Sequence, residues 1–183
     1  MDWNNGTIFR VYILASNSEI NNSTFTTTVN IDQQLLNGKV FMGVENFILE
    51  PVVNTNPTRD YWATLPLIQL SSINLPPYID YSSYPAFFKK SENTKIFARI
   101  PLLLATTLGN SAAPSVSEVR FVFNQLLNKD SIIYEMLNNQ NALSNGKLTI
   151  RISDVGGDAI PNGYISTLYI TLVIYKPNDR YSN

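Results

Sequence analysis

Two pairs of carboxylates are the residues of this sequence whose types and spacing could do chemistry. Glu45 and Glu50 share one predicted strand, and two carboxylates placed across a sugar can hydrolyse a glycosidic bond. Their separation in sequence is odd, so a regular strand would place them on opposite faces. Asp154 and Asp158 flank a Gly-Gly pair, but a calcium loop needs further oxygen ligands and turn chemistry explains both aspartates. We therefore expect no catalytic site and no metal site.

The residue types that usually carry catalysis are missing. The 183 residues include no cysteine and no histidine. Without cysteine there is no disulfide, no thiolate metal site and no cysteine nucleophile. Without histidine the commonest general base and metal ligand are lost, and a Ser-His-Asp triad is excluded. P-loop, dinucleotide-binding and nucleophile-elbow motifs are also absent. The sequence therefore predicts a protein that is not an enzyme and that uses no cofactor.

Aromatic side chains crowd one region of the chain, and three interpretations of this cluster compete. They form part of the core, a platform that stacks on sugars, or an interface with another protein. Aromatic residues are enriched at protein interfaces, so we favour core or interface. Near the N-terminus, Trp3 and Phe9 could anchor an arm on a neighbouring subunit; otherwise Phe9 packs in its own sheet and Trp3 covers the end of the domain. The candidate interface residues are Trp3, Phe9, Trp62, Tyr78, Tyr81, Tyr84, Phe87 and Phe88.

The charge pattern narrows the possible partners. The chain has 13 basic and 14 acidic residues, and its densest basic spot is Lys89-Lys90. Binding to nucleic acid needs several cations that replace phosphate counterions. No segment approaches the length of a membrane span, and Asp2 excludes N-myristoylation. We therefore expect neither direct nucleic-acid binding nor membrane insertion.

Short alternating runs of apolar and polar residues are typical of half-buried β-strands. They occupy residues 8–15, 24–31, 65–73, 94–104, 147–153 and 164–175. In the first run, Phe9, Val11 and Ile13 share one face. In the last run, one face carries Leu168, Ile170, Leu172 and Ile174. Its other face carries Tyr169, Thr171, Val173 and Tyr175, an aromatic and β-branched set that we expect to be only partly wet.

Two further stretches are less regular. Residues 39–50 form a long run whose alternation slips near Glu45-Asn46, which predicts a bulge or bend. Ser115 with Glu118 fits a helix-capping box, yet residues 119–123 alternate like a strand. We place a strand at 119–123 and a short helix or turn at 131–138. The total of about eight strands with little helix predicts an all-β sandwich or barrel.

The segment KLTIRISDVGGDAIPNGYISTLYITLVIYKP, residues 147–177, resembles the closing strands of jelly-roll capsid proteins. The viruses concerned are double-stranded DNA viruses built like adenovirus, polinton-like viruses and virophages. The run KVFMGVENFILEP, residues 39–51, resembles an early long strand of the same proteins. The chain length fits their single jelly-roll penton (vertex) proteins better than their double jelly-roll major capsid proteins.

This resemblance implies a single jelly-roll β-sandwich over residues 1–183, with a short arm at about 1–7 and a tail at about 177–183. It also implies a homopentamer at each vertex of an icosahedral shell, in contact with the major capsid protein and other minor capsid proteins. Such a protein is made in the infected host cell and resides in the virion. The alternative is a carbohydrate- or receptor-binding β-sandwich, which the tyrosine and asparagine content suggests.

Overall fold

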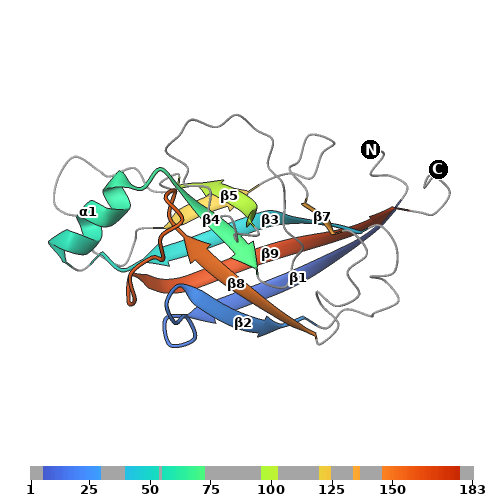
Figure 1. Cartoon of the computed structure of the whole chain (residues 1–183), viewed down its shortest axis with the longest axis horizontal. Helices are drawn as coiled ribbons and strands as arrows, with labels where there is room; N and C mark the ends of the chain where they lie inside the picture. The colour runs from blue at the N-terminus through green and yellow to red at the C-terminus, as the bar shows by residue number, and fades with distance from the viewer. Residues whose placement is uncertain are drawn as a thin grey trace.

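The computed structural model describes residues 6–29, 40–53, 55–72, 96–102, 120–124, 134–136 and 146–177 (Figure 1). Within these residues the chain forms nine strands and one helix. In chain order they are β1 (Gly6–Ser16), β2 (Thr24–Thr28), β3 (Val40–Pro51), α1 (Asn56–Thr64), β4 (Leu67–Ser72), β5 (Ile96–Pro101), β6 (Phe121–Asn124), β7 (Tyr134–Met136), β8 (Lys147–Ser153) and β9 (Ile165–Pro177).

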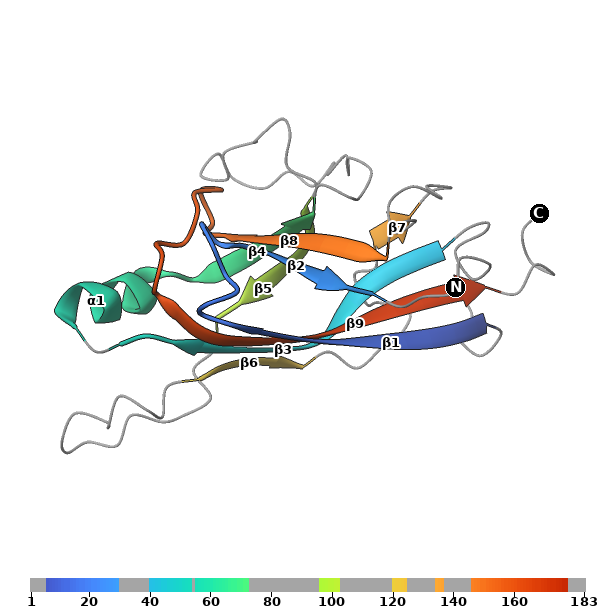
Figure 2. The same cartoon turned by 90° about the horizontal axis from the view of Figure 1, so that it is seen from below.

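The strands form two antiparallel sheets that lie one above the other, as the edge-on view in Figure 2 shows. One sheet has the order β1-β9-β3-β6, and β7 also pairs with β3. The other sheet has the order β2-β8-β4-β5. Two sheets packed face to face around a shared core make a β-sandwich.

The strand pairs are nested along the chain. With β7 set aside, β1 pairs with β9, β2 with β8, β3 with β6 and β4 with β5. The first strand therefore pairs with the last, the second with the second last, and so on inward. This is the pairing of a long hairpin rolled into two sheets, which is the jelly roll. The single jelly-roll fold expected from the sequence is confirmed.

The hydrophobic core lies between the two sheets and follows the predicted alternation. On β1, Ile13 is buried and both Phe9 and Val11 pack against the core. The four residues predicted for the inner face of β9 are all buried. They are Leu168, Ile170, Leu172 and Ile174. Period-two burial on paired strands is what holds the two sheets together, because each strand turns one apolar side inward.

Helix α1 lies at one end of the sandwich (Figures 1 and 2). It was not predicted from the sequence, which assigned no element to these residues. Its start has a recognisable signal: Thr55 precedes the helix, and Pro57 sits in its first turn, where no N–H is needed. The Thr55 backbone N–H donates a hydrogen bond to the Thr58 hydroxyl at 3.2 Å. The helix buries Trp62 against the core.

Of residues 131–138, where a short helix or turn was expected, the structure describes 134–136, and these differ from that expectation. Tyr134–Met136 forms the strand β7, which pairs with Val40–Met42 at the start of β3. The partner lies far away in the sequence, so local pattern did not reveal it. The strand expected at 119–123 is present as β6. The possible capping residues Ser115 and Glu118 lie outside the described residues.

Candidate interaction surface

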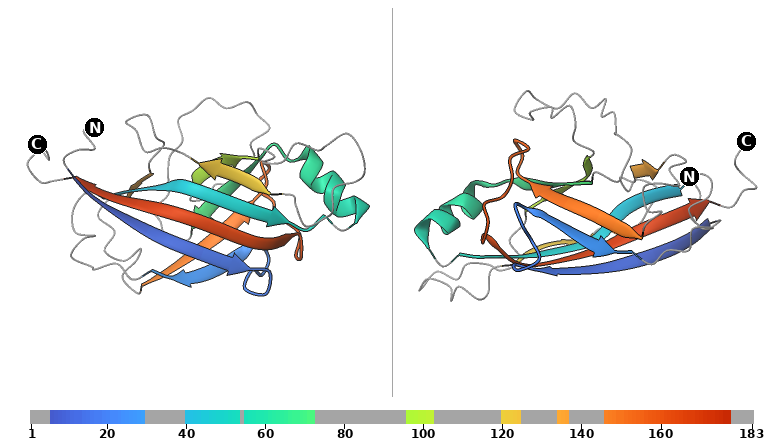
Figure 3. Two further views of the ribbon diagram at one scale, coloured as in Figure 1. Left: turned by 180° about the vertical axis from the view of Figure 1, so that it is seen from behind. Right: turned by 60° about the horizontal axis from the view of Figure 1, so that its bottom comes forward.

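One face of the β1-β9-β3-β6 sheet points away from the core; we call it the outer face (Figure 3, left). Strand β1 forms its border and turns alternate residues outward. Ile8, Tyr12 and Leu14 are 37%, 66% and 69% exposed. An exposed tyrosine and leucine on one strand leave apolar surface in water, and such patches are typical of contact sites.

The pairing register places four apolar outward residues in one line across the sheet. Leu14 on β1 stands opposite Tyr169 on β9, and Tyr169 stands opposite Ile48 on β3. Ile48 in turn stands opposite Val122 on β6, which is 39% exposed. Tyr169 and Ile48 are partly exposed. We call these four residues, Leu14, Tyr169, Ile48 and Val122, the apolar row.

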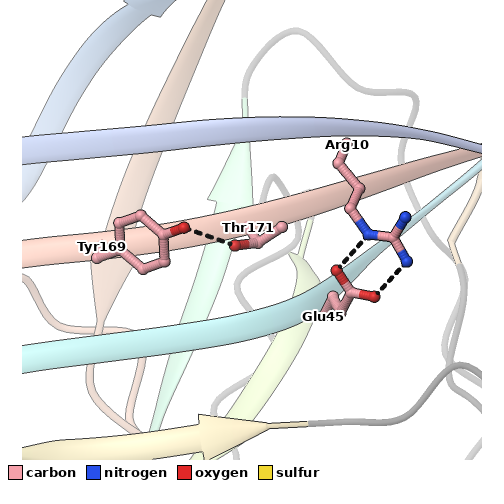
Figure 4. A network of polar contacts seen from close by, with 4 residues as sticks. All are labelled: Arg10, Glu45, Tyr169 and Thr171. Carbon is pink, nitrogen blue, oxygen red and sulfur yellow. Dashed lines mark hydrogen bonds and ion pairs between the residues drawn. The ribbon is translucent and has the colours of Figure 1, made fainter.

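Polar rows border the apolar row on both sides. On one side, Tyr12 stands opposite Thr171, which stands opposite Asn46. The Thr171 hydroxyl donates to the Tyr169 hydroxyl at 3.3 Å (Figure 4). On the other side, Ser16 stands opposite Thr167, and Thr167 stands opposite Glu50. Thr171 is 0% exposed, so the first polar row is covered at its centre. An apolar centre flanked by polar groups is typical of protein contacts.

An arginine–glutamate pair spans the outer face above β9 (Figure 4). The Arg10 guanidinium donates from Nε and from Nη2 to the two carboxylate oxygens of Glu45, both at 2.8 Å. The hydrogen bond from Arg10 holds the pKa of Glu45 below its usual value. Arg10 stands opposite Val173, whose side chain is 1% exposed. The predicted partly wet face of β9 is thus largely covered along this stretch.

The two glutamates of β3 lie on the same face, and not on opposite faces as their odd separation indicated. The register with β9 shifts between Val44 and Asn46, which confirms the predicted bulge. The extra residue is Glu45, and it reverses the alternation so that Glu50 also points outward. Glu50 pairs with Arg120 at 2.9 Å. Each carboxylate is therefore paired with its own arginine, and the two do not form the acid and base pair that hydrolyses a glycosidic bond.

Asp154 and Asp158 take part in a turn. The Asp158 backbone N–H donates to Asp154 Oδ1 at 2.9 Å, and the Gly157 N–H donates to the Asp154 carbonyl oxygen at 3.0 Å. Gly157 has a φ of 84°, a conformation that favours glycine. Within the described residues no group of three potential metal-binding side chains occurs. Nor does any described helix have the length and apolar character to cross a membrane.

Two of the eight candidate interface residues fall in the described part of the chain. Phe9 packs against the core from the inner face of β1. Trp62 is 4% exposed, and its ring lies 5.7 Å from the ring of Phe121. Both therefore follow the core interpretation that was left open for them. The other candidates lie outside the described residues: Trp3, Tyr78, Tyr81, Tyr84, Phe87 and Phe88.

Sequence reasoning missed Tyr12 and Leu14, which are the most exposed large apolar side chains among the described residues. The run 8–15 carries apolar residues on both faces, but the prediction from sequence considered only the face with Phe9, Val11 and Ile13. The sequence did contain a signal. A strand with one solvated face should carry polar residues on that face, and Tyr12 and Leu14 depart from this pattern.

Comparison with known proteins agrees with the strand topology. No family model and no curated protein matches the sequence. Among solved structures, the crystal structure of the mavirus penton protein is similar over 94% of this chain and 100% of that chain. The TM-score is 0.51 and the sequence identity is 8%. The chain therefore shares the fold of the mavirus penton protein, which confirms at the level of the fold the resemblance to virophage-type pentons.

Proposed function

We propose that this protein is a structural capsid subunit, a penton protein that forms homopentamers at the vertices of an icosahedral capsid. The observation that carries the proposal is the likeness to the mavirus penton protein, which extends over 94% of this chain and the whole of that one. Over residues 1–183 the chain acts as a single jelly-roll domain. It resides in the virion after synthesis in the infected host cell.

The outer face gives physical support to an assembling role. It exposes apolar side chains, and its charged residues Arg10, Glu45, Glu50 and Arg120 are already paired within the chain. A partner can therefore cover this face without bringing counter-charges and without burying an unpaired ion. The major capsid protein and other minor capsid proteins are the further partners of such a subunit.

The proposed subunit does not bind nucleic acid directly, and the net charge of −1 supports this part of the proposal. Neutralising phosphates would require clustered lysine and arginine residues. In a structural subunit the carboxylate–arginine pairs shape a contact face, and no residue acts as a nucleophile or general base.

The native mass of the purified protein tests the proposal. Native mass spectrometry should find a complex of five times the chain mass of 20.6 kDa. Dilution should dissociate this complex into chains without a long-lived dimer. A chain that remains monomeric over the whole accessible concentration range would overturn the homopentamer. A stable dimer would do the same.

The carbohydrate-binding alternative finds no support among the described residues. The pocket between the Asn17–Ile20 turn and residues 160–165 has a volume of about 10 Å³. That is the space of one water molecule and is too small for a sugar ring. A glycan array would revive the alternative if binding disappeared when Tyr78, Tyr81 or Tyr84 was changed to alanine.

A further inference from the structure

Among the described residues, strand β1 is an edge strand without the features that normally protect an edge. It is 11 residues long, and its register with β9 continues without a shift over all eleven pairs. It contains neither proline nor lysine. Exposed edges of this kind invite pairing with another strand, so proteins shorten, bend or charge them.

The strands at the other three edges of the two sheets are shorter than β1. Strand β2 has 5 residues and β6 has 4, so both are short. Strand β5 has 6 residues, ends at Pro101 and carries Arg99, and its register with β4 shifts between Leu70 and Ser71. Within the described part of the chain, β1 is therefore the exception.

The single charge on β1 does not protect the edge either. Arg10 is drawn across the sheet by its two hydrogen bonds to Glu45 on β3 (Figure 4). The guanidinium therefore lies above β9 and not beside the open edge. The most exposed large side chains that the strand turns outward are Tyr12 and Leu14, which carry no charge. An uncharged, regular and partly apolar edge is the arrangement that a partner strand requires.

We propose that β1 pairs with β6 of a second copy of this chain, so that the β1-β9-β3-β6 sheets of neighbouring subunits join edge to edge around the pentamer. This inference rests on the proposed function. A ring needs two different surfaces on each subunit, because a surface that binds itself closes a two-fold dimer. The two edges of one sheet meet that requirement.

The strand directions fit this contact. Strand β1 is antiparallel to β9, β9 is antiparallel to β3, and β3 is antiparallel to β6. A neighbouring copy in a similar orientation therefore presents β6 antiparallel to β1, which is the more stable pairing. Because Leu14 and Val122 are the two ends of the apolar row, the row becomes continuous from one subunit to the next.

Charges at the two ends of the neighbouring polar row are complementary. At the β1 end, the Glu19 carboxylate accepts hydrogen bonds from the Ser16 N–H at 2.8 Å and the Ser16 hydroxyl at 2.7 Å. At the β6 end, the Arg120 side chain is 59% exposed while it pairs with Glu50. A guanidinium has five donors, so Arg120 can also bind Glu19 of the neighbouring copy.

Disulfide trapping tests this contact, because the chain has no cysteine of its own. The variant carrying both Leu14→Cys and Val122→Cys should cross-link under mild oxidation into covalent products of up to five chains on a non-reducing denaturing gel. Residues opposite each other on paired strands are close enough for a disulfide. A mixture of the two single variants should give two-chain products.

The matched control replaces Val122→Cys with Thr26→Cys, an exposed residue of β2 in the other sheet. It should give no products larger than two chains. Cross-linking of this control in a native pentamer would show that the outer face docks on the other sheet and would overturn the inference. So would a native pentamer in which the Leu14→Cys/Val122→Cys variant stays uncross-linked. In either case the proposed function stands. A wild-type chain that never oligomerises would overturn both the proposed function and the contact between β1 and β6.

Charge reversal provides a second test that does not depend on cross-linking. Glu19→Arg places two cations at the contact and should raise the concentration at which the pentamer is half dissociated by about tenfold. Adding Arg120→Glu together with Glu50→Arg, which keeps the ion pair within the chain, should restore most of that loss. Equal dissociation of the wild-type protein and both variants would contradict the proposed pairing of Glu19 with Arg120.

Discussion

The two faces of β1 have similar compositions and opposite surroundings. The inner face carries Val11, Ile13 and Ala15, of which Ile13 and Ala15 are each 1% exposed. The outer face carries Tyr12 and Leu14, each about two thirds exposed. Burial of the inner residues stabilises the sandwich, whereas the outer residues contribute little to a single chain. The difference teaches that the fold of one chain explains the inner face of the strand, and that the outer face is explained only under the proposed contact with another subunit.

The largest effect is expected on the inner face. Ile13→Ala removes a buried side chain from the core and should lower the free energy of unfolding by about 2–5 kcal/mol. Chemical denaturation of the variant under conditions where the protein is monomeric measures this loss. A change below about 0.5 kcal/mol, typical of surface positions, would remove the distinction between the two faces.

The end of the outer face near Gly6 is covered, so a substitution there should also destabilise the chain. A Cβ atom at Gly6 would overlap the ring of Tyr175, which is 1% exposed. Gly6→Ala should therefore lower the free energy of unfolding by about 1–3 kcal/mol. Combining it with Tyr175→Leu should cost less than the sum of the two single changes. Additive costs would show that the two residues do not meet.

The open part of the outer face should respond in the opposite way. Leu14→Thr introduces a β-branched residue that suits a strand, and it shortens the apolar side chain. It should change the stability of the monomer by no more than about 0.5 kcal/mol, and it should lower the fraction of pentamer in native mass spectra. The matched control is Thr26→Ser on the other sheet, which should leave both quantities unchanged. A Leu14→Thr variant that unfolds like Ile13→Ala would contradict the account.

The smallest effect is expected from the ion pair on the outer face. Glu45→Gln should destabilise the chain slightly at neutral pH, because partly exposed ion pairs contribute little. Arg10 lowers the pKa of Glu45 in the folded chain, so its contribution is present above the unfolded pKa and is lost as pH falls through the folded value. The difference in the free energy of unfolding between the wild-type and Glu45→Gln proteins, measured by denaturation, should therefore be smaller at pH 3 than at pH 7. A gap that widens at pH 3 would contradict the assigned role of Arg10.

Much of the sandwich could be predicted from the sequence because its strands carry strict alternation. The inner face of β9 and the bulge at Glu45 were both visible in the pattern. Strand β7 was not, because its pairing with β3 depends on a partner about ninety residues away in sequence. Helix α1 was missed although Thr55 and Pro57 mark its start.

The apolar row was harder to predict than the fold. The apolar row exists only when the registers of four strands are known, because Leu14, Ile48, Val122 and Tyr169 are scattered along the chain. The aromatic residues that drew attention were abundant in sequence, and the two that the structure describes, Phe9 and Trp62, pack inside. Composition therefore did not indicate where exposed apolar residues gather, and only the sheet register placed them in one row.

Electron microscopy of the purified wild-type protein tests the central claim most directly. Two-dimensional class averages show the symmetry of an assembly without any assumption about its interface. The account predicts ring-shaped particles with five-fold symmetry, in which each unit has the size of one jelly-roll domain. Particles with two-fold symmetry, or single domains at every concentration examined, would contradict a vertex subunit that assembles with copies of itself.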